Sequence, residues 1–354
     1  MTEHSRWNDG RELRIGVRVM VRRHLRDGDT SHLYTDVLGE VTGLEPLRVR
    51  PKSGGEVEIP DADIAVLKVL PPRPVMVRDI RALTSAAGRG WPGTETEIVG
   101  GWMCRAGDSW SYRHGAAVPV HPWAVDTDLA EIAEWYSARA LPAWVELPRR
   151  LVAADQLLVD GSRMTSDAAS AMEAAGSGEL EVRTAALDAL VPEGSSTGAG
   201  SPAGGAGSVG EALPPGAKIE LTETPSDGFL AAYHGTATFS RDIVAPTLAA
   251  HTDGVRFAHL LIDGELAAIA RGSLSAADSG PTTLGISCVE TTPDFRRRGL
   301  ARDVVVALAE WARGEGASTA HLHVFRRNTA GLALWSELGF VEHHRTLHAP
   351  IPRG

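Results

Sequence analysis

Apolar and polar residues alternate at every second position in several short runs near the start of the chain. Val17–Arg22 alternates almost throughout, and turn signals such as Gly54-Gly55 separate the later runs. Short alternating runs at this spacing are typical of a small all-β barrel or sandwich. Residues 11–71 are therefore predicted to form an all-β domain, which either docks a partner or packs against the rest of the chain.

Helical and strand patterns are mixed between residues 75 and 190, beyond a stiff proline-rich segment at 71–74. The spacing of apolar residues predicts helices over 79–87, 129–140 and 167–175. β-prone runs predict strands over 95–104, 109–118, 143–147 and 180–183, the first two paired around Gly107-Asp108. An aromatic patch in this α+β domain either fills its core or lines a pocket. Its members are Trp102, Trp110, Tyr112 and Trp123.

Residues 191–216 contain almost nothing to bury, because Gly, Ser and Ala dominate positions 195–208. This composition predicts a flexible linker. Residues 217–354 form the last predicted domain, which opens with a strand over 219–222 and helices over 227–234 and 240–250. A hairpin follows, with strands 256–262 and 265–271 joined by the strong turn pair Asp263-Gly264.

The chemistry of the chain is concentrated in a strand–turn–helix pattern within this last domain. A β-prone run over 284–290 is followed by Arg296-Arg-Arg-Gly-Leu-Ala301, and then by helical spacing through Val304, Leu308 and Trp311. Backbone N–H groups at such a turn point the same way, and the start of a helix adds positive partial charge. Gly299 lets the main chain approach a phosphate closely, and the arginines add charge. The turn therefore predicts a pyrophosphate cradle, whereas the plain alternative is an ordinary turn with solvated arginines.

Composition narrows the class of protein further. The chain has 354 residues, 43% of them apolar, and a net charge of -10, which argues against nucleic-acid binding and suits a cationic substrate. Cys104 and Cys288 cannot build a disulfide framework or a zinc set. The charged N-terminus predicts no signal peptide, and no run approaches the roughly 18 apolar residues of a membrane span. We therefore expect a cytoplasmic protein.

At these motifs the chain resembles the GNAT superfamily of acyl-CoA-dependent N-acyltransferases. Arg296-x-x-Gly299-x-Ala301 fits the family's pyrophosphate motif, and Thr291-x-Pro293 stands where the family often has Val-x-Pro. The family's later motif is matched at four positions, Asn328, Leu334, Gly339 and Phe340. It departs at two positions, where Gly331 replaces an alanine and Trp335 replaces a tyrosine. The resemblance implies an α+β chain with a GNAT acyltransferase fold over 217–354.

The rest of the chain is similar to a group of actinobacterial GNAT proteins with an SH3-like N-terminal domain and two tandem acetyltransferase-like halves. The features that carry this likeness are Trp91-Pro-Gly and Gly101-Trp102. It implies an SH3-like barrel over 11–71 and a degenerate GNAT-like domain over 75–190. Because the middle domain lacks the arginine-glycine turn, we expect it to bind no acyl-CoA and to wall the active cleft. Residues 217–354 alone are then expected to bind acetyl-CoA.

The resemblance also assigns the residues that hold acetyl-CoA, between the two strands that flank the motif. The expected contacts are Val289, Thr291, Arg296, Arg297, Arg298, Gly299, Leu300, Ala301, Asn328 and Trp335. A primary amine then attacks the thioester carbonyl directly, which requires positioning, an oxyanion donor and control of protons. The implied activity is acetyl transfer to a protein lysine or N-terminus, or to a small amine.

The acid–base groups that the family commonly uses are absent here. The usual carboxylate position, eleven residues before Arg296, is Gly285, and an indole such as Trp335 cannot act as a proton acid. Glu290 is the nearest carboxylate and the predicted catalytic residue, and His323 is the nearest imidazole. Cys288 is expected to be a core residue rather than a nucleophile. No metal site is expected from the C-terminal histidines, because no carboxylate or cysteine falls at ligand spacing.

These departures leave a second function open. The chain is predicted to be an acetyl-CoA-dependent N-acetyltransferase, and the alternative is a non-catalytic acyl-CoA-binding or scaffold protein with the SH3-like domain as a recruitment module. Under either hypothesis the partners are acetyl-CoA and an amine-bearing acceptor or basic protein, with no membrane and no direct nucleic-acid binding.

Overall fold

The computed structural model describes residues 13–25, 34–71, 74–107, 115–191, 213–233, 241–278 and 280–352. Trp110, Tyr112, most of the predicted strand 109–118 and most of the predicted linker lie outside these residues. The chain divides into two compact units, Met1–Pro74 and Val75–Gly354.

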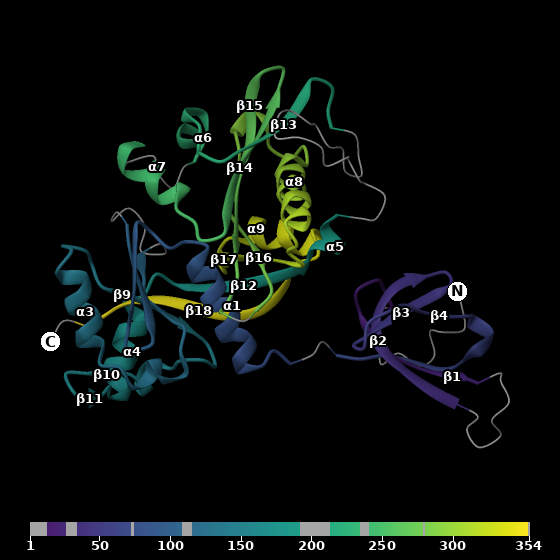
Figure 1. Cartoon of the computed structure of the whole chain (residues 1–354), viewed down its shortest axis with the longest axis horizontal. Helices are drawn as coiled ribbons and strands as arrows, with labels where there is room; N and C mark the ends of the chain where they lie inside the picture. The colour runs from purple at the N-terminus through teal and green to yellow at the C-terminus, as the bar shows by residue number, and fades with distance from the viewer. Residues whose placement is uncertain are drawn as a thin grey trace. The chain divides into compact units, whose positions relative to one another are not determined.

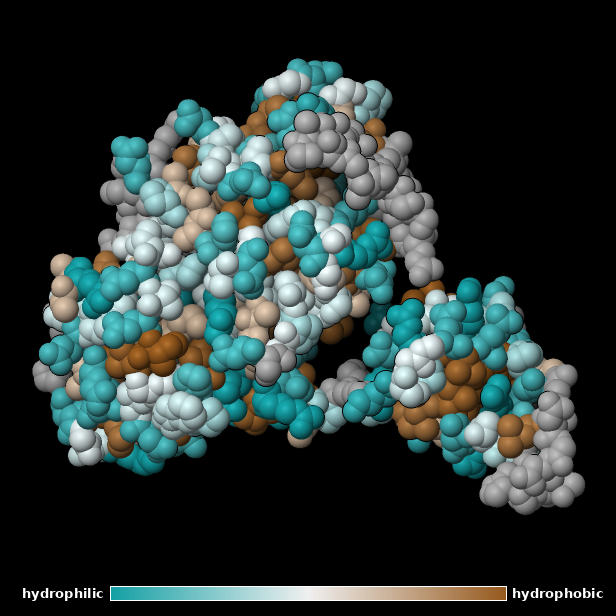
Figure 2. All heavy atoms as spheres, viewed as in Figure 1, coloured by the Kyte–Doolittle hydropathy of each residue, from teal (hydrophilic) through white to brown (hydrophobic). Residues whose placement is uncertain are grey.

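The N-terminal unit is a five-stranded antiparallel sheet, which confirms the predicted all-β domain. Its strands are β1 (Arg18–His24), β2 (Tyr34–Leu44), β3 (Leu47–Pro51), β4 (Val57–Ile59) and β5 (Ile64–Val69), in the order β4-β3-β2-β1-β5. A 3-10 turn, η2 (Asp61–Asp63), leads into β5. The alternation seen in the sequence buries Val19 and Val21 on one face. Figure 2 shows apolar side chains grouped on the surface of this unit, and such groups often mark interaction surfaces.

The second unit is built on one eight-stranded mixed sheet (Figure 1). In sheet order its strands are β13 (Ala217–Thr222), β14 (Gly254–Ile262), β15 (Glu265–Ser275), β16 (Thr283–Thr291), β17 (Thr319–Phe325), β12 (Glu179–Ala186), β18 (Val341–Pro350) and β9 (Trp144–Pro148). Neighbours are antiparallel except β16 and β17, which are parallel. The predicted hairpin is confirmed, since Asp263 and Gly264 both adopt positive φ in the turn between β14 and β15.

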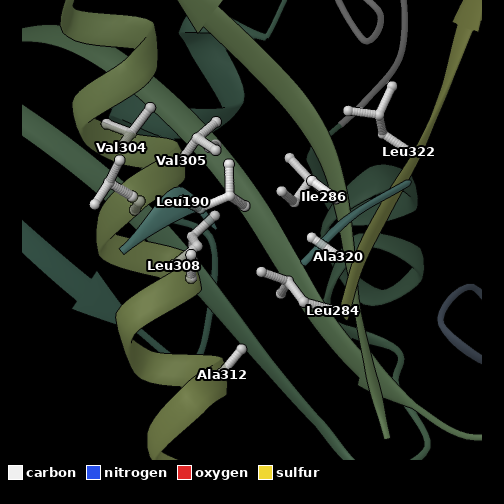
Figure 3. Packing of buried hydrophobic residues seen from close by; sticks show 14 of the residues in the cluster. Leu190, Leu284, Ile286, Val304, Val305, Leu308, Ala312, Ala320 and Leu322 are labelled. Carbon is white, nitrogen blue, oxygen red and sulfur yellow. The ribbon is translucent and has the colours of Figure 1, made fainter. Parts of the chain in front are cut away.

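Helix α8 (Leu300–Gly314) packs its apolar stripe on one face of this sheet (Figure 1). The predicted positions Leu300, Val304 and Leu308 are buried there against Leu284 and other strand residues. Figure 3 shows Leu190, from the short helix α5 (Leu187–Leu190), inserted between α8 and the strands. Helix α9 (Thr329–Glu337) follows β17, and α6 (Asp227–Ala232) and α7 (Arg241–Ala249) precede β14.

Strand β12 joins the two segments that the sequence divides at the linker. It belongs to the middle segment, but it lies between β17 and β18 and is hydrogen-bonded to both. In Figure 1, β18 extends among the elements of the middle segment, and its Leu347 and Ala349 are buried in their core. The middle and C-terminal segments therefore share one sheet, and neither completes it alone.

The remaining elements of the middle segment form a lobe with its own small sheet. The strands β6 (Glu95–Val99), β7 (Trp102–Ala106) and β8 (Val118–Pro119) pair in that order. The β6–β7 hairpin turns at Gly100-Gly101, so the predicted unbroken strand 95–104 is wrong. Both glycines have positive φ, and a turn there lets Trp102 begin the buried strand. Strand β7 pairs in turn with β8, through Trp102 with Pro119 and Met103 with Val118, while residues 108–114 of the predicted pair lie outside the described residues. The other elements are α1 (Val77–Arg89), η3 (Pro122–Asp126), α3 (Leu129–Ser137), η4 (Ala154–Gln156), β10 (Leu158–Val159), β11 (Ser162–Arg163) and α4 (Ser166–Ala174).

Candidate active site

Strands β16 and β17 separate shortly after they begin. They pair only from Thr283 with Thr319 to Gly285 with His321, although both strands run on for several residues. At the same place the pairing of β16 with β15 is shifted, and Cys288 adopts a positive φ of 53°. A bulge of this kind bends a strand and interrupts its pairing. The backbone of Val289 is thereby left beside the gap between the two strands.

The turn that follows β16 has the backbone of an anion cradle. A 3-10 turn, η6 (Pro293–Phe295), leads to Arg297 and Gly299, which have φ of 61° and 80°. The amide of Arg302 donates to the carbonyl of Gly299, so the amides just before it lie at the open start of α8. A Cβ built on Gly299 meets nothing within 4 Å, which leaves open space above the turn.

The side chains of the turn have separate roles. Arg296 donates from Nε to the carbonyl of Thr291 at 3.2 Å, which ties the turn to the end of β16. Arg298 donates from Nη2 to the carbonyl of Asp294 at 3.0 Å. Leu300 anchors the helix start in the core, while Ala301 is half-buried next to it.

The later motif spans α9, from its N-cap Asn328 to Gly339 and Phe340 just beyond its end. The side chain of Asn328 caps this helix by accepting from the amide of Gly331 at 2.9 Å. A Cβ at Gly331 would lie 2.7 Å from the Asn328 amide nitrogen, so the glycine makes room for this cap. Trp335 is buried in the core cluster, where its ring meets Phe340 edge-on at 5.4 Å.

A pocket lies where β16 and β17 diverge. It is a narrow pocket with a cavity volume of about 30 Å³, and Gly285, Ser287 and His323 line it from the two strands. Its other wall comes from the middle segment, through Trp91 and Glu146. The middle segment thus lines this pocket together with the two strands.

Two buried arginines fasten that wall. Arg271, on β15, donates from Nη2 to the carbonyl of Gly90 at 3.1 Å and lies 3.8 Å from the Trp91 ring. Arg105, on β7, donates from Nη1 to the carbonyl of Trp91 at 3.1 Å. Burial lowers the pKa of Arg271 to about 10, which still leaves it charged at neutral pH. The end of α1 is therefore held from both segments.

The carboxylate in this pocket is Glu146, which sequence reasoning missed. It is buried on β9 and accepts from Thr346 Oγ1 at 3.1 Å, while His348 Nε2 lies 3.1 Å from its second oxygen. His323 Nε2 lies 3.6 Å from Glu146 Oε1. Burial acts to raise the pKa of Glu146, but the contacts with His323 and His348 hold that pKa well below its usual range. The available signal was a glutamate inside the apolar strand 143–147, because a buried carboxylate requires partners.

The structure also accounts for the missing carboxylate at position 285. A Cβ built on Gly285 would lie 3.0 Å from Ser273 Oγ and 3.1 Å from His321 Nε2. The space that a side chain would enter is therefore filled by the His321 imidazole. Burial lowers the pKa of His321 to about 3, so this ring is neutral.

Glu290 lies farther along β16, after the bulge. It pairs with Ile269, whose side chain packs with Cys288, so Glu290 and Cys288 share a face of the sheet, as predicted. Glu290 is partly exposed and is not among the described residues that line the pocket. Its catalytic role stays a prediction.

The middle segment repeats the strand–helix–strand pattern of the cradle. Ala117, beside β8, forms a parallel bridge with Val145 of β9, and α3 connects these two strands, as α8 connects β16 and β17. The start of α3 differs, because the Asp128 carboxylate accepts from the amides of Ala130, Asp160 and Gly161 at 2.5–3.1 Å. These amide bonds lower the pKa of Asp128. The chain's own carboxylate thus caps the start of α3.

The described residues contain neither a metal-binding group nor a membrane-spanning helix. Within the described ranges, no group of three or more His, Cys, Asp or Glu is arranged to hold a metal ion. None of the helices in the part of the chain that the structure describes is long and apolar enough to cross a bilayer.

Comparison with known proteins covers both units. A family model described as the C-terminal part of the probable histone acetyltransferase Rv0428c matches residues 77–186 and 206–349. A model described as the Rv0428c N-terminal Sm-like domain matches residues 13–68, in agreement with the small β-domain predicted there.

Individual relatives are similar to this chain over different lengths. Probable histone acetyltransferase Rv0428c of Mycobacterium tuberculosis is 29% identical over 345 residues, which is 95% of each chain. Uncharacterized N-acetyltransferase YobR of Bacillus subtilis is 33% identical over 63 residues, which is 17% of this chain and 26% of YobR. A solved GCN5-related N-acetyltransferase from Kribbella flavida is 16% identical and covers 80% of this chain and 97% of its own. Its TM-score to this chain is 0.46.

Proposed function

The chain belongs to the Rv0428c family of GNAT N-acetyltransferases, which carry an N-terminal Sm-like domain, and from this premise we propose that it transfers an acetyl group from acetyl-CoA to a primary amine. It is an acyltransferase, and the finer identities of donor and acceptor are the proposal. Membership in this acetyltransferase family favours an enzyme over a non-catalytic scaffold protein.

One observation supports acetyl-CoA as the acyl donor. The gap between β16 and β17 lies next to the turn at the start of α8. The backbone of Val289–Thr291 borders the gap, and the pantetheine arm would extend along it as an added strand. The amides of Arg297–Ala301 would hold the pyrophosphate, with Arg296 and Arg298 adding positive charge. Asn328 fixes the start of α9, and Trp335 supports that helix from the core.

The acceptor is proposed to be a primary amine, either a protein lysine or N-terminus or a small amine. The pocket between the strands and the middle segment holds one buried carboxylate, Glu146, which favours a cationic ligand. The net charge of -10 would also attract a basic acceptor. The printed name of the Mycobacterium tuberculosis relative, a probable histone acetyltransferase, supports testing basic proteins first.

The test is release of free thiol from acetyl-CoA, with poly-L-lysine, purified core histones and a panel of small amines as acceptors. Binding of acetyl-CoA is measured separately by calorimetry. Binding together with amine-dependent thiol release supports the proposal. A chain that binds no acetyl-CoA would remove the donor assignment, and one that binds it but releases no thiol with any amine would remove the acceptor assignment.

A further inference from the structure

We propose that His323 takes the proton from the acceptor amine and that Glu146, supplied by the middle segment, positions His323 and stabilises its charged form. This inference rests on the proposed acetyl transfer and deepens it. It also gives the middle segment a part in the chemistry beyond walling the cleft.

The first support is where the residues lie. Glu146 is on β9 and His323 is on β17, so the pair brings together residues from both segments of the chain. His323 lines the pocket at the point where β16 leaves β17, beside the predicted position of the thioester. Its side chain keeps 14% of its surface exposed, whereas Glu146 and His348 keep 7% and 2%. Of these three groups, His323 is the one that a ligand in the pocket can reach.

The second support is the geometry of the contact. His323 presents Nε2 to Glu146 Oε1 at 3.6 Å, slightly beyond hydrogen-bond length, and such contacts often tighten when substrate binds. The carboxylate is itself held in place by Thr346 and His348, each at 3.1 Å. With Nε2 turned toward the carboxylate, Nδ1 is the ring position left to accept a proton. This is the arrangement of a base oriented by a third group.

The third support is the charge around His323. The titratable and charged groups that face it are His321 on its own strand, His344 and His348 on β18, Glu146 on β9 and Arg105 on β7. Burial lowers the pKa of His321 and of His344 to about 3, so both rings are neutral. Arg105 is occupied by the carbonyls of Ala116 and Trp91. Glu146 is then the only acidic group among the described residues lining the pocket, and it would stabilise a positive His323.

The cost of burying Glu146 points the same way. A carboxylate taken out of water costs several kcal/mol, and no arginine or lysine is paired with Glu146 in the described parts of the chain. A purely structural position on β9 would be filled more stably by an apolar residue. Buried ionisable groups that line a cleft are candidates for function for this reason.

The reaction moves two protons from the acceptor nitrogen. The ammonium form of the acceptor gives one proton to Nδ1 of His323, and the resulting imidazolium is stabilised by Glu146. The neutral amine attacks the thioester carbonyl carbon, so that a C–N bond forms and the C–S bond breaks. The second proton leaves the nitrogen and protonates the departing thiolate through water, and His323 returns its proton to solvent. The products are the amide, free CoA thiol and one proton.

The experiment compares Glu146→Gln, His323→Gln and Glu290→Gln in the full chain, with poly-L-lysine as the acceptor. Calorimetry first checks that each variant binds acetyl-CoA like the wild type and is therefore folded. His323→Gln should lower kcat/KM by about a hundred- to ten-thousand-fold, the usual contribution of a general base. Glu146→Gln should move the acid limb of the pH–rate profile to lower pH, because the opposite charge beside the base is lost.

A matched control is Glu181→Gln. Glu181 is a half-buried carboxylate of the same sheet, paired with Arg183 and turned to the opposite face from Leu180 and Val182. Its loss removes a negative charge from the sheet but should leave the pH–rate profile in place. A shift as large as that of Glu146→Gln would mean that the effect is general rather than local, and would overturn the assignment.

Histidine NMR provides a readout that does not need turnover. The ring nitrogen signals of His323 show which nitrogen carries the proton, in the wild type and in Glu146→Leu, which offers no acceptor. The wild type should hold the proton on Nε2, toward the carboxylate, and the variant should lose this preference. An unchanged tautomer overturns the pairing even if acetyl transfer is real. A changed tautomer in a protein that transfers no acetyl group would reject the proposed function while keeping the pair. Full activity in His323→Gln, with the loss found in Glu290→Gln instead, would return the role to Glu290.

Discussion

Removing strand β12 should abolish acetyl-CoA binding. This strand lies outside the predicted cofactor domain, and it contains none of the residues predicted to contact the cofactor. The perturbation is made in a chain expressed as two pieces, 1–191 together with 213–354. The comparison pair is 1–178 with 213–354, which lacks β12 and α5 only. The same reasoning predicts that residues 217–354 alone will not bind, contrary to the expectation from sequence.

The magnitude follows from what the missing segment buries. Leu187, Leu190 and Val191 lie in the core under α8, each at most 5% exposed. Burial of such side chains contributes about 1.5–3 kcal/mol each, so their loss costs roughly 5–9 kcal/mol as an upper bound. Folded domains are stable by only about 5–15 kcal/mol. The strands β17 and β18 also lose their hydrogen-bonded neighbour, so little stability should remain.

The assay has two stages. Co-purification and far-ultraviolet circular dichroism report whether each pair assembles, and calorimetry measures acetyl-CoA affinity. The complete pair should assemble and bind with an affinity close to that of the intact chain, while the shortened pair should do neither. Cooperative unfolding and near wild-type affinity in the shortened pair, or in 217–354 alone, would refute the reasoning that β12 is part of the cofactor-binding fold.

Three further predictions concern single residues. Gly299→Asp should weaken acetyl-CoA binding by at least about 2 kcal/mol in calorimetry, whereas Gly316→Asp, at a similar φ of 85° and in similarly open space at the other end of α8, should leave affinity unchanged. The buried neutral rings of His321 and His344 have pKa values lowered by burial to about 3. The unfolded chain therefore binds more protons below about pH 6.5, and the free energy of unfolding should fall by about 1.4 kcal/mol per histidine between pH 7.5 and 5.5. Urea titrations of the wild type and of His344→Gln measure this slope, and equal slopes would contradict it. Trp335→Tyr should lower stability by about 1–3 kcal/mol without raising turnover, because the indole packs in the core; a faster enzyme would show that thiolate protonation limits the rate.

Local patterns predicted the parts of the fold that depend on neighbouring residues. The backbone turns at Arg296–Ala301 and Asp263-Gly264 are each specified within a few positions, and both are formed as expected. The apolar spacing of α8 likewise needs no information from elsewhere in the chain.

What the sequence could not predict depends on contacts between distant segments. Glu146 and Thr346 are 200 residues apart, so no local motif could place that carboxylate in the cleft. The insertion of β12 between β17 and β18 could not be predicted either, because the sequence Leu180–Arg183 would suit an edge strand as well as a central one. The hairpin turn at Gly100-Gly101, by contrast, has a local signal, because a glycine pair readily adopts the positive φ that such turns require.

The position of β12 also sets the order in which the chain can fold during synthesis. This strand is made before either of its neighbours, since β17 ends at residue 325 and β18 at residue 350. At roughly 5–20 residues per second, β12 waits on the order of ten seconds with both edges unpaired. Its alternate positions Glu181 and Arg183 are charged, and charged side chains discourage an unpaired strand from pairing with another chain during that interval. The sheet is therefore closed last by β18, and the enzyme should gain its cleft only when that C-terminal strand docks.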